Sequence, residues 1–303
     1  MALIQELTKK KLIHPPKWLP DNMCYATIMG SQAYGVSDDS SDMDIYGFCM
    51  PPKHIIFPHL AGVIIGFGEQ GEKFEQFQAV NNVVDPNANG GKGRKYDISI
   101  YNIVRYFHLC MHMNPNMVDS LFTPTNCVIH STKVGEMVRA ARRDFLNKKC
   151  WHTYKGYAYA QMKKMSSQER TGKRKEVVDE YGFDLKFGYH LVRLMGEVEQ
   201  ILREGDLDLQ RDNERLKAIR RGEWTEERIK EYFAEQEKLL EQVYIDSQLP
   251  YSPNDVEPKL KNLLLNCLEE HYGSLEGCVV QPDIAVQALR DIRAVIDRVS
   301  DLL

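Results

Sequence analysis

The sequence predicts an α+β protein, with a mixed α/β part over residues 1–135 and an α-helical part over residues 136–303. Short apolar runs that end at Gly, Pro or polar residues dominate the first part, and such runs are typical of β-strands. Apolar residues at helical spacing dominate almost every segment after about residue 132. We therefore expect a mixed sheet with flanking helices, followed by a helical domain.

The expected strands are short. Gly30-Ser31 stops the first apolar run and Pro51-Pro52 follows the second, and both pairs are typical strand ends. Between the second and third runs, residues 86–93 form a loop by their Pro, Asn and Gly content. We expect strands at 24–29, 44–50 and 96–100.

Helical spacing begins directly after the third strand. Asp184 and Thr225 precede two of the periodic segments and are side chains that favour the N-cap position. Glu226-Glu227 then places negative charge in the first turn, where the helix dipole favours it. We expect helices at 103–114, 134–145, 151–165, 184–203, 225–244, 257–271 and 283–303.

Composition favours a globular, cytoplasmic protein. The chain has 43% hydrophobic and 27% charged residues, and no apolar run reaches the roughly 20 residues that cross a membrane. We expect no signal peptide, because the apolar run at the N-terminus is too short. Seven cysteines without a C-x-x-C pair favour reduced, packed thiols over disulfides or a thiolate zinc site.

Three aspartates form the pattern most indicative of chemistry. Side chains alternate along a strand, so Asp42 and Asp44 point the same way, while Met43 and Ile45 point into the core. Asp97 likewise lies opposite the apolar residues of its own strand. If the two strands are neighbours, three carboxylates converge on one patch of the sheet.

Such a cluster needs positive charge, because carboxylates a few ångströms apart repel strongly. Mg²⁺ or Mn²⁺ prefers carboxylate oxygens and shares its remaining coordination with substrate phosphates. Two such ions clamp the attacking and leaving oxygens of a phosphoryl displacement. Gly30-Ser31 offers backbone N–H groups, a hydroxyl and the start of a short helix at 32–34 to a triphosphate. A D-x-D pair alone is more often a solvated turn or strand edge, so the combination carries the prediction.

These motifs resemble a known signature. The runs 30–35 and 41–47 look like the polymerase β-type nucleotidyltransferases. More narrowly, the chain resembles the predicted nucleotidyltransferases of RNA-repair gene clusters, also found in phages. The narrower resemblance rests on 96–101, 114–116, 182–186 with His190 and Arg193, and 219–224.

The resemblance implies transfer of a nucleoside monophosphate from an NTP such as ATP to a hydroxyl, with release of pyrophosphate. It implies that Asp42 and Asp44 bind two metal ions, and that Asp97 binds one of them and activates the acceptor. Our preferred acceptor is an RNA 3′ end. AMP transfer to a protein or small molecule, and a non-catalytic RNA-binding factor, are the alternatives. Asp38 and Asp39, in the insert before this pair, are expected to be solvated loop charges.

Basic residues of the helical part are expected to meet the substrates. Lys186, His190 and Arg193 stand at i, i+4 and i+7 on one helix face, where they could neutralise a triphosphate. The alternative for this stripe is a solvated face.

Residues 139–175 hold twelve Lys or Arg and two acids, in a chain whose net charge is −4. Aromatic residues interleave with these charges, as in proteins that hold single-stranded nucleic acid, although most of the aromatics could be core. Lys173, Arg174 and Lys175, in an expected mobile loop, are the predicted nucleic-acid contacts.

Two other patterns favour structural roles. His108 and His112 stand at i, i+4 but have no third ligand at zinc spacing, so packed or surface histidines are expected. The glycines of 66–71 match a dinucleotide fingerprint only in their letters, without a convincing following helix or an acid at the right distance.

Overall fold

The computed structural model describes residues 3–37, 41–56, 73–167 and 172–273. Residues 1–267 form one compact unit, and residues 268–303 form a second. The first unit contains both the sheet and most of the helices, so the expected division at residue 135 stays a prediction. Within the described residues, every helix is too short or too polar to cross a lipid bilayer.

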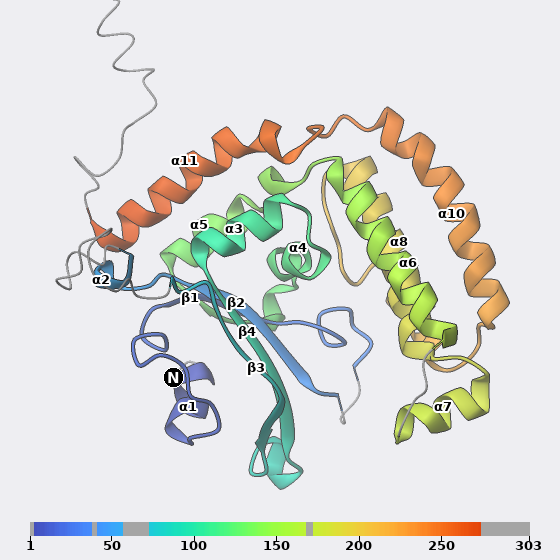
Figure 1. Cartoon of the computed structure of the whole chain (residues 1–303), viewed down its shortest axis with the longest axis horizontal. Helices are drawn as coiled ribbons and strands as arrows, with labels where there is room; N and C mark the ends of the chain where they lie inside the picture. The colour runs from blue at the N-terminus through green and yellow to red at the C-terminus, as the bar shows by residue number, and fades with distance from the viewer. Residues whose placement is uncertain (1–2, 38–40, 57–72, 168–171, 274–303) are drawn as a thin grey trace, which may run out of the picture. The chain divides into compact units, whose positions relative to one another are not determined.

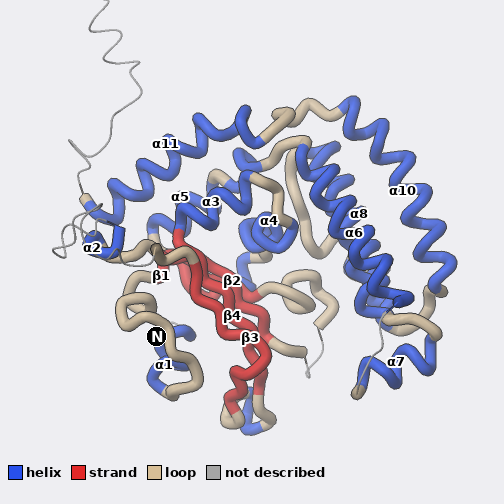
Figure 2. The backbone as a smooth tube through the Cα atoms, viewed as in Figure 1, coloured by secondary structure: helices blue, strands red, loops and turns tan. Residues whose placement is uncertain are grey.

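The core of the first unit is a mixed five-stranded sheet with the order β3-β4-β2-β1-β5 (Figures 1 and 2). Strands β2 and β4 pair in parallel, and the other neighbours pair antiparallel. Strands β1, β2 and β4 match the three predicted runs. The strands are β1 (Met23–Ile28), β2 (Met43–Cys49), β3 (Gln76–Asp85), β4 (Arg94–Asn102) and β5 (Val128–Ser131).

Two faces of the sheet have different roles. Ile45 of β2 and Ile98 and Ile100 of β4 are fully buried in a core cluster with Ile4 and Leu7 of α1. Asp44 and Asp97, the intervening residues, occupy the opposite face, which helices α3 and α4 partly cover. The alternation predicted for β2 and β4 is therefore confirmed.

The helices follow the predicted periodicity, with two N-caps as expected. Asp184 accepts a hydrogen bond from the backbone of Lys186, and Thr225 accepts one from Arg228. The helices are α1 (Leu3–Lys9), α2 (Lys53–Ile56), α3 (Ile103–Met111), α4 (Pro115–Phe122), α5 (Lys133–Ala140), α6 (Lys149–Ser167), α7 (Lys173–Tyr181), α8 (Leu185–Glu204), α9 (Asn213–Arg220), α10 (Glu226–Asp246) and α11 (Pro253–Tyr272). Short 3-10 turns cover Asn89–Gly91, Thr125–Cys127 and Arg142–Phe145.

Several expectations need correction. The predicted helix 134–145 ends at Ala140 and continues as a 3-10 turn. Residues 173–175 begin helix α7 and are not part of a loop. The predicted helix 283–303 lies outside the described residues.

Helix α8 is the centre of the helical half, because it packs against α6, α9 and α10. Fourteen of its residues are buried, from Leu185 at its first turn to Leu202 near its last. This burial fixes the start of α8, which faces the Asp44 side of the sheet.

Candidate active site

A cavity of about 700 Å³ lies between the sheet and helices α6, α7, α8 and α9. On the sheet side it is lined by the carboxylates and by the turn that follows β1. On the helical side it is lined by aromatic, apolar and polar residues together with five cations, Lys164, Arg174, Lys186, Arg193 and Arg220. Most of the sequence-predicted site residues meet here: Gly30, Ser31, Asp42, Asp44, Asp97, Arg174, Lys186, His190 and Arg193.

Asp44 and Asp97 lie directly opposite each other on neighbouring parallel strands. Residues in register in a parallel pair project from the same face of the sheet, so both carboxylates face the cavity. Asp42 precedes β2 by one residue and is exposed. The prediction that the two strands are neighbours is thus confirmed.

The surroundings of Asp44 disfavour the ionised form of its carboxyl group. Burial, followed by the nearby charge of Asp97, raises the pKa of the Asp44 carboxyl from 3.8 to about 6, and Lys186 opposes this shift. Among the described residues, no three His, Cys, Asp or Glu side chains are gathered tightly enough to hold a metal ion by themselves. The binding of Mg²⁺ or Mn²⁺ by the three aspartates therefore stays a prediction.

Gly30 packs against the Asp44 carboxylate. A Cβ at position 30 would lie 2.1 Å from Asp44 Oδ2, and the backbone φ of +65° is one that other residues rarely adopt. The backbone N–H of Met29 donates to the carbonyl of Asp44 at 2.7 Å. These contacts set the end of β1 directly beside the carboxylate.

The chain after β1 is a turn, and the predicted short helix at 32–34 does not form. Tyr34 N donates to Gly30 O at 3.2 Å and Val36 N donates to Ser31 O at 2.9 Å, but no regular helix follows. Gly30 and Gly35 both have positive φ and close the segment at its two ends. We call residues 30–36 the β1 turn. Its donors are the N–H groups of a tight turn, without the dipole of a helix N-terminus.

The helical wall of the cavity begins at the first turn of α8. Lys186 is exposed there, one turn before His190. Burial, together with the charges of Arg193, Lys186 and other cations, holds the pKa of His190 well below its usual range. The imidazole is therefore neutral at neutral pH, and it can donate or accept a hydrogen bond but adds no charge.

The chain also matches a known protein family. The RlaP family model, described as RNA repair pathway DNA polymerase beta family, matches residues 4–262. The chain belongs to this family. No curated protein matches it. Membership confirms the resemblance inferred from the sequence, and indicates a polymerase β-like nucleotidyltransferase of RNA repair.

Arg193 is buried, whereas the sequence predicts that it lies on a basic face of the helix. Its side chain is 6% exposed, and Nη1 donates to Asp119 Oδ2 at 2.5 Å and to Glu197 Oε1 at 2.7 Å. Burial raises the pKa of both carboxyls, and the guanidinium opposes the shift. Arg193 also lines the cavity, so its predicted contact with nucleotide phosphates stays a prediction beside these internal ion pairs.

Arg174 also has an environment that the sequence did not indicate. It lines the cavity, pairs with Asp184 at 2.6 Å and lies over the ring of Phe187 at 4.6 Å. Arg174 thus faces the cavity from α7, and its predicted contact with nucleic acid stays a prediction. Lys175 is exposed on α7, and the side chain of Lys173 lies outside the described residues.

The basic band 139–175 does not form one continuous surface. Arg139 donates hydrogen bonds to Tyr25 of β1 and to Thr123 at the end of α4, and Arg143 pairs with Asp206. Lys155 stacks on Trp151. Phe145, Trp151 and Tyr154 are core residues, whereas Tyr157 and Tyr159 are exposed. The predicted nucleic-acid band is therefore largely structural along its first half.

Sequence reasoning missed several residues of the cavity wall. Tyr157, Gln161 and Lys164 line it from α6, at i, i+4 and i+7, and this spacing was visible in the sequence. Arg220 lines it from α9 and donates to the carbonyl of Val36. That contact joins segments far apart in the chain, so no local pattern could have indicated it.

The other candidates have structural roles or fall outside the described residues. The rings of His108 and His112 stack at 4.2 Å, and His112 Nδ1 lies 3.0 Å from the His108 carbonyl. The six described cysteines are buried and free, as expected. Asp38, Asp39, Cys278 and the glycine-rich run at 66–71 lie outside the described residues.

Proposed function

We propose that this family member transfers a nucleoside monophosphate from an NTP to a hydroxyl at an RNA 3′ end and releases pyrophosphate. The observation that carries the proposal is the in-register pair of Asp44 and Asp97 at one wall of the cavity. The opposite wall presents the cations of Lys186 and Arg174. A polyanionic substrate with divalent cations between the walls would satisfy both.

Asp42 and Asp44 would hold two Mg²⁺ or Mn²⁺ ions, and Asp97 would complete the coordination of one of them. When bound, the ions would neutralise the triphosphate and polarise the reacting phosphate. Asp97 would also accept the proton of the acceptor hydroxyl as its oxygen attacks the α-phosphorus. The new O–P bond forms as the bond from the α-phosphorus to the β-phosphate oxygen breaks, and pyrophosphate leaves.

The remaining residues would bind and orient the triphosphate. The backbone N–H groups of the β1 turn and the hydroxyl of Ser31 would donate to its phosphate oxygens. Lys186 and Arg174 would stabilise the charge that develops on the leaving pyrophosphate. His190, neutral at working pH, would contribute a hydrogen bond.

RNA is the proposed acceptor because the family is one of RNA repair. The exposed Lys175 of α7, beside the cavity wall that Arg174 forms, could contact the phosphates of a strand whose 3′ end lies at Asp97.

The test is incubation of the protein with each α-labelled NTP, Mg²⁺ or Mn²⁺, and a pool of short RNAs. The matched control is the double variant Asp42→Ala, Asp44→Ala. Label on RNA that disappears with the variant supports the proposal and identifies the preferred base. Label on the protein or on a small molecule instead would favour AMP transfer. RNA binding without any label would make the protein a non-catalytic RNA-binding factor.

A further inference from the structure

We infer that Tyr34, Asp119 and Arg193 form a buried latch that positions the β1 turn against helix α8. The latch belongs to no local sequence motif, because its residues come from the turn, from α4 and from α8. Its effect on nucleotide binding rests on the proposed function, whereas its effect on the turn itself does not.

One carboxylate oxygen joins the three residues. Asp119 Oδ2 accepts from the Tyr34 hydroxyl at 2.8 Å and from Arg193 Nη1 at 2.5 Å. The Arg193 guanidinium also lies over the Tyr34 ring, with 4.2 Å between Cζ and the ring centroid. Tyr34 is 2% exposed and Asp119 is 0% exposed. A displacement of the β1 turn would therefore break a buried hydrogen bond and a cation–π contact together.

The buried cluster around Arg193 contains polar atoms whose burial lowers the stability of the fold. Asp119 Oδ1, Arg193 Nε, Glu197 Oε2 and the Tyr154 hydroxyl are buried without a hydrogen-bond partner among the described residues. Buried ion pairs often stabilise a protein no more than apolar residues of the same volume would. Their better-attested contribution is to select one arrangement of the chain, which here is the seat of the β1 turn.

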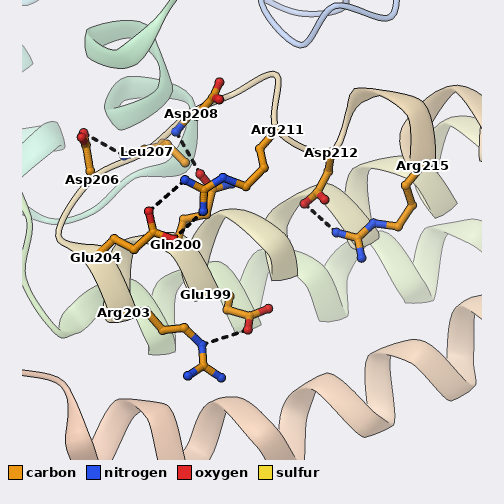
Figure 3. Close-up of polar contacts among 10 residues, drawn as sticks. All are labelled: Glu199, Gln200, Arg203, Glu204, Asp206, Leu207, Asp208, Arg211, Asp212 and Arg215. Carbon is orange, nitrogen blue, oxygen red and sulfur yellow. Dashed lines mark hydrogen bonds and ion pairs between the residues drawn. The ribbon is translucent and has the colours of Figure 1, made fainter.

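The far side of the turn is held by the helical half as well. Gln210 Nε2 donates to the carbonyl of Ala33 at 3.2 Å, and Arg220 donates to that of Val36. Gln210 lies in the connection between α8 and α9. In that connection Asp208 N donates to Gln200 at 2.9 Å, and Arg211 pairs with Glu204 at 2.5 Å (Figure 3). The β1 turn is thus fixed from α4, α8 and α9.

Helix α8 connects the latch to the cavity. Arg193 stands seven residues after Lys186, so the two lie on one face of the helix. The latch therefore sets the position of Ser31 relative to Lys186 across the cavity. Because both would bind the same triphosphate, Tyr34, Asp119 and Arg193 are positioning residues for the nucleotide.

The test compares Tyr34→Phe with Tyr106→Phe in the full chain. Tyr106 is a matched control, because its buried hydroxyl pairs with Ser120 of the same helix α4 at 2.6 Å and does not touch the β1 turn. Both changes remove one buried hydroxyl and keep the ring. Asp119→Asn, a change of the shared acceptor, is the second latch variant.

Two readouts separate positioning from stability. Amide hydrogen exchange over residues 30–36 should be about tenfold faster in Tyr34→Phe and unchanged in Tyr106→Phe. Dissociation constants for ATP, CTP, GTP and UTP with Mg²⁺ should rise about fivefold in Tyr34→Phe, the effect of one lost buried hydrogen bond, and more in Asp119→Asn. The melting temperatures of the two Tyr→Phe variants should fall by similar amounts.

Unchanged exchange in Tyr34→Phe, or equal acceleration in Tyr106→Phe, would overturn the latch. If the wild-type protein binds none of the four nucleotides while the turn still loosens in Tyr34→Phe, the latch stands and the proposed function fails. If the nucleotides bind equally well to all variants although the turn loosens, the turn does not position the triphosphate, and that part of the inference is refuted.

Discussion

The Asp44 carboxylate should lower the stability of the metal-free protein. It is half-buried beside Asp97 with its pKa raised to about 6, so its ionised form is disfavoured in the folded state. The unfolded chain carries no such penalty. Replacing Asp44 by Asn keeps the shape of the side chain and removes its charge. We predict that Asp44→Asn stabilises the metal-free protein at neutral pH while abolishing nucleotidyl transfer.

The sign and size of the effect follow from proton linkage. Between the unfolded pKa of 3.8 and the folded pKa of about 6, the folded state holds a proton that the unfolded state has lost. Stability therefore falls as pH rises through this window, and the loss persists above it. A pKa shift of about 2 units lowers the free energy of unfolding by about 3 kcal/mol. A change of that size moves a melting temperature by about 6 °C.

The assay is chemical unfolding in EDTA at about pH 4 and about pH 8, for wild type and variant. The difference in stability between the two proteins should grow by about 2 kcal/mol from the lower to the higher pH, because a small part of the effect is already present at about pH 4. Comparing the two pH values cancels any change in packing that the amide introduces. Asp42→Asn is the comparison and should give a smaller change with pH, because Asp42 is exposed and its charge is the smallest of the causes that raise the pKa of Asp44. A difference that does not change with pH would refute the assigned environment of Asp44.

Four further outcomes are expected. Mn²⁺ should raise the melting temperature of wild type but not of Asp44→Asn in a thermal scan, since only a complete site gains from ligand binding. Gly30→Ala should reduce the rate of label transfer by about 100-fold, because its Cβ would lie 2.1 Å from the Asp44 carboxylate. Lys186→Ala should raise KM for the NTP about tenfold in steady-state kinetics, with an unchanged melting temperature, because the side chain is exposed. Gly222→Ala, whose Cβ would lie 2.0 Å from the ring of Tyr181, should displace helix α7 and also raise KM, whereas equal KM values would show that α7 does not shape the cavity.

The parts of the fold that depend on local periodicity could be predicted from the sequence. The alternation in β2 and β4 placed Asp44 and Asp97 on the polar face because period-2 patterns are local. Strand β3 was missed because Gln76 and Gln78 on its exposed face interrupt the apolar signal. Strand β5 was missed because it has only four residues, all half-buried.

Contacts between distant segments limited the prediction of the site. The β1 turn reads as a helix start by composition, but Gly30 takes a left-handed φ that brings its backbone against the Asp44 carboxylate. Arg193 reads as part of a basic face, because the sequence does not show that Asp119 and Glu197 surround it. In both cases the prediction used only neighbouring residues in the sequence, whereas contacts with distant segments determine the conformation or the environment of the residue.

Contacts between distant segments also determine how the charge asymmetry of the sequence is distributed in the fold. Counting along the chain assigns residues 139–175 a large positive charge, yet Arg143 and Lys155 of this band pair with acids elsewhere in the fold. Neutralised in this way, they add little to the field at a distance. Lys164 and Arg174 of the same band line the cavity across from Asp44, and Arg174 pairs there with Asp184. For a polyanionic substrate, the cations that face the carboxylate wall matter more than the net charge of a segment, and the fold determines which cations those are.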